Sequence, residues 1–161
     1  MKRTIIAIVA ALALPTAALA ADSSTKDSAS AACKAEKAGM GAATFKATYG
    51  GKANAFGKCV SARTKTIAAA KTNAAQQCKA EMDAAGGKPK GSAYGKCVSG
   101  KVKKATTDET KARVNAAKTC KAAKKADAAA FATAWGSGKN AFGKCVSATA
   151  RAKNDSTTTS S

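Results

Sequence analysis

The chain has 161 residues, with 28 basic and 9 acidic side chains and a formal net charge of +19. It contains no histidine, which removes the commonest general base and a common metal ligand, and only Asp108 and Glu109 are adjacent acidic residues. No Cys-x-x-Cys motif is present to hold zinc or to act as a redox pair. We therefore expect no enzymatic activity, no catalytic residue, no metal, no cofactor and no small-molecule substrate.

Residues 1–20 have the pattern of a Sec-type bacterial signal peptide. Lys2 and Arg3 precede an apolar run over residues 5–14, and Ala18-Leu19-Ala20 supplies the small residues of a cleavage site. The apolar run is too short for a spanning helix, which needs about 20 residues. The pattern predicts a secreted or periplasmic protein with no transmembrane segment after cleavage.

Three copies of one cysteine-containing unit follow. Each opens with Cys-Lys-Ala and closes with an aromatic residue and Gly-Lys-Cys-Val-Ser, and the units span residues 33–59, 78–97 and 120–145. Such repetition indicates one supersecondary unit used three times. An even number of cysteines in a small exported chain is typical of a disulfide framework.

Helix geometry restricts how the cysteines can pair. If residues 54–85 form one helix, a rise of ~1.5 Å per residue places Cys59 and Cys78 roughly 28 Å apart, too far to bond. Cys78 and Cys97 lie symmetrically about the turn signal at residues 86–89, so a helical hairpin would bring them together. We expect each unit to close on itself, with each bridge contributing ~3 kcal/mol. The predicted pairs are Cys33 with Cys59, Cys78 with Cys97, and Cys120 with Cys145.

The predicted fold is all-α, with disulfide-stapled helical hairpin repeats and about four helices that are antiparallel in sequence order. Ala and Lys, both strong helix formers, dominate the stretches between the repeats. Asn54, Ser92 and Asn140 are residues of N-cap type at the same point of each unit. The expected helices cover residues 24–38, 54–85, 92–130 and 140–153.

These helices make up a predicted three-repeat domain over residues 31–153. Polar tails, expected to be disordered, flank it at residues 21–30 and 154–161. The spacing of apolar residues places Phe56, Val60 and Ile67 on one buried face. A compact bundle and an extended zigzag both fit the Ala-rich faces.

All seven aromatic residues lie between paired cysteines, where they would pack the corners. Beside each closing cysteine stands Gly57, Gly95 or Gly143, which we expect to allow two backbones to approach. The mature chain has no Leu, so these corners hold most of the large apolar side chains. The structural corner aromatics are Phe45, Tyr49, Phe56, Tyr94, Phe131, Trp135 and Phe142.

The Cys-Lys-Ala-Glu opening, the Phe-x-x-x-Tyr-Gly insert and the Asn-Ala-Phe-Gly-Lys-Cys-Val-Ser closing resemble uncharacterised secreted bacterial proteins built from the same paired-cysteine unit. The resemblance covers residues 33–59 and 120–145, and the shorter second unit less completely. It implies export and repetition of the unit, and it implies no activity.

The excess of lysine is the remaining clue to function. Attraction to polyanions is the physical expectation, whether they are cell-envelope polymers, anionic lipids or nucleic acid. Lys58, Lys96 and Lys144, beside the closing cysteines, are the candidate contacts. The alternative is a structural or cell-envelope protein whose charge serves only solubility. A membrane-active role is disfavoured because no helix has a strongly apolar face.

Overall fold

In the computed structural model of the chain, residues 23–51 and 53–158 are described, with side chains as far as Lys153. These residues form helices joined by turns, and no strand occurs among them, which confirms the all-α prediction for this part of the chain. The predicted signal peptide lies outside the described residues. The helices are α1 (Ser23–Met40), α2 (Ala42–Thr48), α3 (Ala55–Ala84), α4 (Gly91–Ala126), α5 (Ala128–Trp135) and α6 (Ala141–Thr158).

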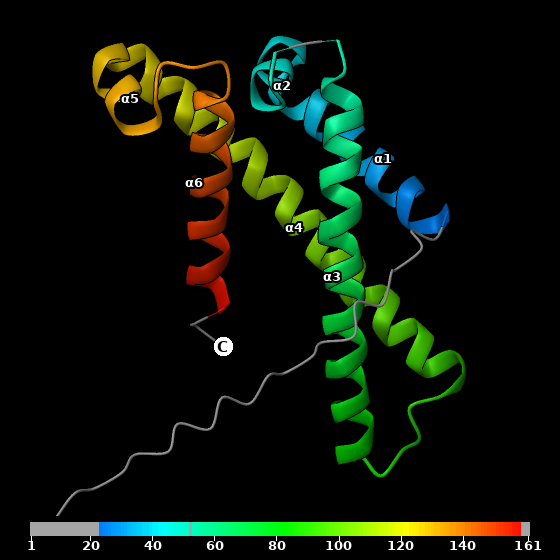
Figure 1. Cartoon of the computed structure of the whole chain (residues 1–161). Coiled ribbons are helices and arrows are strands. Elements are labelled where there is room, and N and C mark those ends of the chain that lie inside the picture. The colour runs from blue at the N-terminus through cyan, green and yellow to red at the C-terminus, as the bar shows by residue number, and fades with distance from the viewer. Residues whose placement is uncertain (1–22, 52, 159–161) are drawn as a thin grey trace, which may run out of the picture.

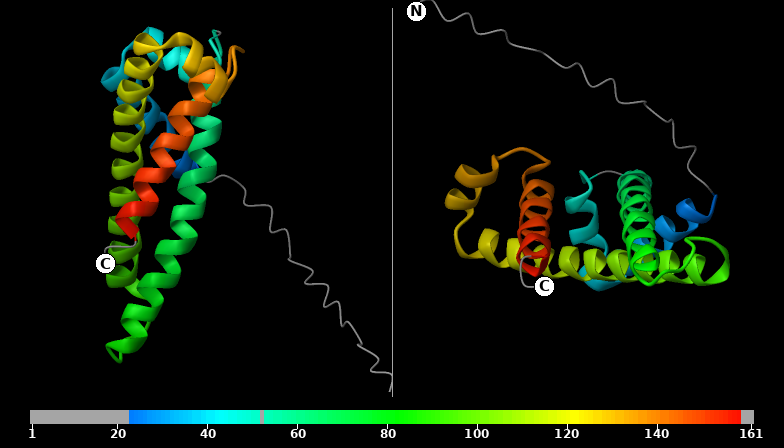
Figure 2. Two further views of the ribbon diagram at one scale, coloured as in Figure 1. Left: turned by 90° about the vertical axis from the view of Figure 1, so that its left-hand side faces the viewer. Right: turned by 90° about the horizontal axis from the view of Figure 1, so that it is seen from below.

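The longest helix, α4, is the spine of the molecule. It packs against α1, α3, α5 and α6, while α2 lies between α3 and α6 and contacts both (Figure 1). Seen along the axes of α3 and α6, these two helices lie on the same side of α4 with α2 between them (Figure 2). Since α1 packs on both α3 and α4, three of the long helices form a bundle, and α6 is added to it through α4 and α2.

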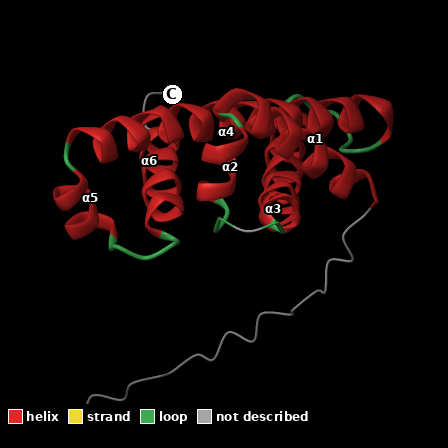
Figure 3. Cartoon of the chain, turned by 90° about the horizontal axis from the view of Figure 1, so that it is seen from above, coloured by secondary structure: helices red, strands yellow, loops and turns green. Residues whose placement is uncertain are grey.

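The expectation of four helices is wrong, because two short helices lie inside the paired-cysteine loops of the first and third units. These are α2 and α5, which lie at one end of the molecule (Figures 1 and 3). The helix expected over residues 92–130 ends at Ala126. Asp127 leaves helical geometry with φ −149° and ψ 101°, and its side chain accepts a 2.8 Å hydrogen bond from the backbone N–H of Ala130. This N-cap starts α5 in a new direction.

The expected polar tails are largely helical. Residues 23–30 belong to α1, which agrees with the helix expected over residues 24–38 and not with a disordered tail over residues 21–30. Thr25 and Ala29 are buried there. The Nζ of Lys71 donates a 2.6 Å hydrogen bond to Thr25 Oγ1, which fixes this end of α1 on α3. At the other terminus α6 continues to Thr158, and residues 159–161 lie outside the described residues.

The predicted helix starts agree with the structure at two of three units. Asn54 is the N-cap residue of α3, although its side chain makes no capping hydrogen bond, and Asn140 directly precedes α6. Ser92 is not a cap, because α4 already begins at Gly91. Gly91 has a φ of +77°, a conformation that glycine adopts without strain, and it lets the chain enter the helix one residue early.

The core consists of two clusters around the first and third bridges. Phe45 lies beside Cys33 and Cys59, whereas Phe131 and Phe142 lie beside the third bridge. Met40 packs against both clusters and joins them. The other corner aromatics, namely Tyr49, Phe56, Tyr94 and Trp135, are only partly buried.

The buried stripe of α3 differs from the predicted one by one residue. Ala55, Cys59, Arg63 and Ile67 are buried at a spacing of four, whereas Phe56 and Val60 are only partly covered. The bridge from Cys59 to α1 fixes this rotation of the helix. It also buries Arg63, which the apolar pattern does not place on the buried face.

Of the three glycines beside the closing cysteines, only Gly143 supports close backbone approach. A Cβ atom at this position would collide with the carbonyl oxygen of Thr48 in α2. At Gly57 the nearest atom belongs to the side chain of Asn54, which can move, and at Gly95 the space is open. The expectation therefore fails at Gly57 and Gly95, because no second backbone passes there.

Candidate functional site

Three disulfides staple the long helices in sequence order. Cys33–Cys59 joins α1 to α3, Cys78–Cys97 joins α3 to α4, and Cys120–Cys145 joins α4 to α6, with Cα separations of 6.0, 6.0 and 6.1 Å. These are the three pairs that the cysteine spacing predicts. No free thiol remains among the cysteines.

An ion pair accompanies the first two bridges at matching positions. The third residue after the opening cysteine is an acid, and the fourth residue after the closing cysteine is a base. In the first unit these residues are Glu36 and Arg63, which form an ion pair. In the second unit Glu81 and Lys101 pair at 2.8 Å.

Antiparallel packing explains why these positions meet. Side chains on a helix lean toward its own N-terminus, so long side chains placed C-terminal to each cysteine lean back toward the bridge from opposite sides. In the third unit the same two positions are Ala123 and Thr149. Acid and base are thus present together in two units and absent together in the third.

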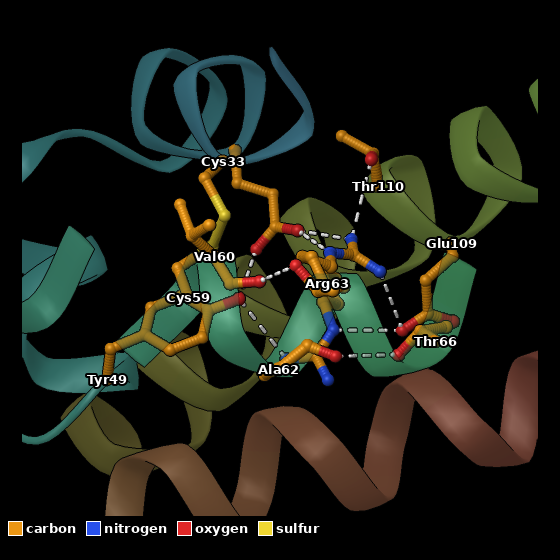
Figure 4. The surroundings of a disulfide bond; sticks show 12 residues. Cys33, Tyr49, Cys59, Val60, Ala62, Arg63, Thr66, Glu109 and Thr110 are labelled. Carbon is orange, nitrogen blue, oxygen red and sulfur yellow. Dashed lines mark hydrogen bonds and ion pairs between the residues drawn. A yellow bond between two sulfur atoms is a disulfide. The ribbon is translucent and has the colours of Figure 1, made fainter. Parts of the chain in front are cut away.

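In the first unit this pair belongs to a closed ring of five side chains, which we call the buried ring. Arg63 binds Glu36 and also lies 3.2 Å from Glu109 Oε1, to which Arg113 Nε donates a 2.9 Å hydrogen bond. The hydroxyl of Tyr49 donates to Glu36 Oε2 at 2.6 Å and accepts from Arg113 at 3.5 Å. The ring adjoins the Cys33–Cys59 bridge and joins α1, α3, α4 and the end of α2 (Figure 4).

The buried ring is electrically balanced, and its Glu36–Arg63 pair is almost completely removed from solvent. Glu36 is 0% exposed and Arg63 is 1% exposed, so each ion depends on its partners to offset the loss of hydration. Burial, followed by the negative charge of Glu36, raises the pKa of Tyr49. Burial alone would lower the pKa of Arg113, but Tyr49 and the two carboxylates outweigh it, and that pKa is raised. Tyr49 is therefore neutral and Arg113 charged at physiological pH.

The buried atoms of this ring are satisfied within the protein. No buried side-chain nitrogen or oxygen among the described residues lacks a hydrogen-bond partner, and the partly exposed Tyr49, Glu109 and Arg113 bring the ring to the surface. Cys78, Glu81 and Cys97 bring ligand-type atoms within 4.8 Å of one another, but the two sulfurs are bonded to each other. In the oxidised protein they are disulfide sulfurs and not thiolate ligands.

The ring could not be foreseen from apolar periodicity, but one signal was present. Glu36 and Glu81 occupy the same position in their units, and Arg63 and Lys101 each follow the closing cysteine by four residues. A matched acid and base on two helices joined by a bridge point to an ion pair beside it. Glu109 and Arg113 lie outside the units and gave no such signal.

The three lysines predicted as polyanion contacts do not form one face. Lys58 and Lys144 lie in the first turns of α3 and α6, which begin at the end of the molecule that carries α2 and α5 (Figure 1). Lys96 lies near the start of α4, at the opposite end. All three side chains are exposed. The structure therefore distributes these charges over both ends.

Several hollows lie on the described surface, among them two grooves and a smaller pocket. A groove of about 980 Å³ between α1, α3 and α4 is lined mainly by Ala, Ser, Thr and Val, and one of about 940 Å³ follows α3 and α4 as far as Lys153. A smaller pocket of about 570 Å³ lies between the end of α5 and α6. Trp135, Lys144 and Arg151 line this third hollow.

No protein-family model, curated protein or solved structure matches this chain. The resemblance carried by the repeat motif thus remains an expectation from the sequence. Within residues 23–51 and 53–158, no helix has the length and apolar character that a bilayer crossing requires.

Proposed function

We propose that the chain is an exported, non-enzymatic, cationic helical repeat protein that binds polyanions with an affinity that falls as salt rises. Anionic cell-envelope polymers are the partners that an exported protein would meet first. The observation that carries the proposal is an uncompensated excess of lysine and arginine over the C-terminal part of the fold.

Most of the acidic side chains are already occupied within the protein. Glu36 and Glu109 are bound in the buried ring, and Glu81 pairs with Lys101. Two further acids, Asp83 and Asp108, pair with lysines one helical turn away. The surface field therefore comes from the remaining cations.

The excess of basic over acidic residues is densest after residue 110. From there to residue 153 the only acid is Asp127, which caps α5. Four exposed lysines occupy the last turns of α4, where the negative end of the helix dipole stabilises positive charge. We call them the α4 lysine cluster, and they are Lys118, Lys121, Lys124 and Lys125.

Three disulfides and the leader-like residues 1–20 support an oxidising location such as the periplasm or the cell exterior. Lysine clusters attract polyanions by releasing condensed counterions, which requires no sequence or shape readout. Such binding needs no catalytic group. It is therefore compatible with a chain that lacks histidine, the commonest general base.

The second candidate is a structural envelope protein whose lysines only maintain solubility. The closed, neutral buried ring and the three staples favour it, because they serve durability without presenting a ligand site. On this reading the α4 lysine cluster is a solvated helix end. No association with polyanions would then be measurable at physiological salt.

Titration of the oxidised protein with heparin, duplex DNA and anionic vesicles, each at ~0.05 and ~0.2 M salt, separates the two candidates. The affinity should fall steeply over this range. A protein that contacts six to ten phosphates of duplex DNA loses about 10³ to 10⁵ in affinity when salt rises from ~0.05 to ~0.2 M. If none of the three polyanions binds measurably at either salt concentration, the polyanion-binding proposal is rejected and the structural envelope protein is favoured.

A matched pair of variants then locates the contact. Changing the α4 lysine cluster to Gln removes four charges, as does changing Lys34, Lys37, Lys88 and Lys90, which are exposed elsewhere. The first variant should reduce the salt slope by more than the second. Equal losses would show that the charge acts as a whole and not through α4.

A further inference from the structure

The pocket between α5 and α6 combines an aromatic face with two cations. Trp135 stands at the end of α5, and Lys144, Ser147 and Arg151 line the pocket from α6. The spacing of these α6 residues places them on one face of the helix. No acidic side chain lines the pocket.

The tryptophan is held in place. Trp135 packs against the core cluster of the third unit, so its ring is partly covered and partly turned to the pocket. Gly136 follows with a φ of +88°, which turns the chain away directly after the ring. A restrained ring loses little conformational freedom when a ligand stacks on it.

Comparison with the first unit shows what has changed at this corner. Tyr49 occupies the position of Trp135, and its hydroxyl is engaged by Glu36 and Arg113 in the buried ring. In the third unit the acid position is Ala123 and the base position is Thr149, so the ion pair of the first unit is not repeated beside Trp135. Both rings pack against a core cluster, but Trp135 also lines a pocket between α5 and α6.

We infer that this pocket, which we call the Trp135 pocket, binds a sugar unit that carries a carboxylate or a phosphate. The apolar face of the sugar ring would stack on the indole, Arg151 and Lys144 would bind the anionic group, and the Ser147 hydroxyl would hydrogen-bond a ring substituent. A volume of about 570 Å³ is within the ordinary range for small-ligand sites. This inference deepens the proposed function, since it assigns one component of an anionic polymer to a defined site.

Nucleic acid fits the pocket less well. Proteins that bind single strands use several aromatic side chains on which successive bases stack. Trp135 is the only tryptophan of the chain and the only aromatic residue that lines this pocket. A single indole ring with Lys144 and Arg151 nearby is suited to a ligand with one sugar ring and one anionic group.

Trp135 also supplies the assay, because its fluorescence reports this pocket alone. The probes are a hyaluronan tetrasaccharide, glucose 6-phosphate, the uncharged N-acetylchitotetraose and the oligonucleotide dT4, each titrated at ~0.15 M salt. Both anionic sugars should change the emission saturably. The uncharged sugar should bind on the order of tenfold more weakly, because it lacks the charge-assisted contacts.

The matched variants carry the same change in net charge. Lys144→Gln with Arg151→Gln should weaken binding of the tetrasaccharide by on the order of tenfold or more, whereas Lys118→Gln with Lys125→Gln should change it by less than about twofold. Circular dichroism of each variant checks that the helices persist. Trp135→Ala, followed by calorimetry, should abolish binding of the tetrasaccharide.

Three outcomes would overturn the inference: no saturable fluorescence change, equal losses in the two double variants, or tighter binding of dT4 than of the tetrasaccharide. Salt-sensitive binding of heparin without any response of Trp135 would reject the pocket and leave the proposed function intact. Tetrasaccharide binding without any salt-dependent polymer binding would retain the pocket and reject the broader proposal.

Discussion

At the scale of single residues, Glu36 and Arg63 are ions with almost no access to water. Removing two charges from water costs several kcal/mol per ion, and close partners offset that cost only when their hydrogen bonds are complete. Tyr49 and Glu109 complete them here. Loss of either Glu36 or Arg63 would leave its partner as a buried charge without its principal counter-ion.

Glu36→Gln should therefore lower the free energy of unfolding by about 3–5 kcal/mol, because it leaves Arg63 without its principal counter-ion. Glu81→Gln is the matched control, since Glu81 has the same position in the second unit but pairs with Lys101 at the surface. That change should cost at most about 1 kcal/mol. Denaturant unfolding of both oxidised variants measures the difference, and equal losses would contradict the role assigned to burial.

Tyr49 gives the buried ring a dependence on alkaline pH. Its folded pKa is raised by burial and by Glu36, so the folded protein keeps this proton at pH values where the unfolded chain, with a tyrosine pKa of about 10, loses it. The contribution to stability is fully present below pH ~10 and is lost as pH rises further.

Wild-type stability should thus fall above pH ~10 more steeply than that of Tyr49→Phe, by up to about 1.4 kcal/mol per pH unit. Lys79 and Lys104, whose pKa values are raised by hydrogen bonds to Asp83 and Asp108, are present in both proteins and cancel in the comparison. Unfolding curves between pH 8 and 11 provide the test. Parallel curves would show that Tyr49 is not the titrating group.

At the scale of helices, α2 and α6 approach so closely that only a glycine fits between them. Gly143→Ala should destabilise the protein by about 1–3 kcal/mol, because the new Cβ would collide with the carbonyl of Thr48 and push α2 aside. Gly95→Ala, at the same position of the second unit, meets open space and should stabilise α4 by up to about 1 kcal/mol. Thermal unfolding distinguishes the two, and the same sign for both changes would refute the packing argument.

Helix type and bridge positions could be predicted at this scale, because Ala/Lys propensity and the symmetry of Cys78 and Cys97 about a turn are local properties. The start of α5 could not, since Asp127 competes with a strongly helical run and its capping bond appears only in the fold. The burial of Arg63 depends on Glu36 and Glu109, which come from other helices. The spacing of apolar residues along one helix gives no information about ion-pair partners on other helices.

The same limit applies to the candidate site. The sequence marked Lys144 through its place beside Cys145, and Trp135 as a corner aromatic. Only the packing of α5 on α6 brings these two residues and Arg151 to one pocket. Lys58 and Lys96 share the local motif of Lys144 but lie elsewhere, because their helices start at different places in the fold.

At the scale of the whole molecule, three bridges compensate for a core made largely of alanine and cysteine. Alanine buries little apolar area, so each Ala-rich contact between helices stabilises the fold only slightly. The first and third bridges lie inside the two core clusters, whereas the second joins α3 to α4 near the turn that connects them. The fold therefore protects the three disulfides from solvent to different degrees.

The Cys78–Cys97 bridge should be the first to open under mild reduction. Attack by a thiolate requires access to a sulfur. Cys97 is the one half-buried cysteine among the six, whereas the other five are buried. Timed alkylation followed by mass spectrometry should show this pair labelled before the other two in the folded protein. In denaturant the order should disappear, since protection by the fold is lost. Earlier labelling of Cys33 and Cys59 would mean that the end of the molecule containing the buried ring opens more readily than the α3–α4 turn, contrary to the packing described above.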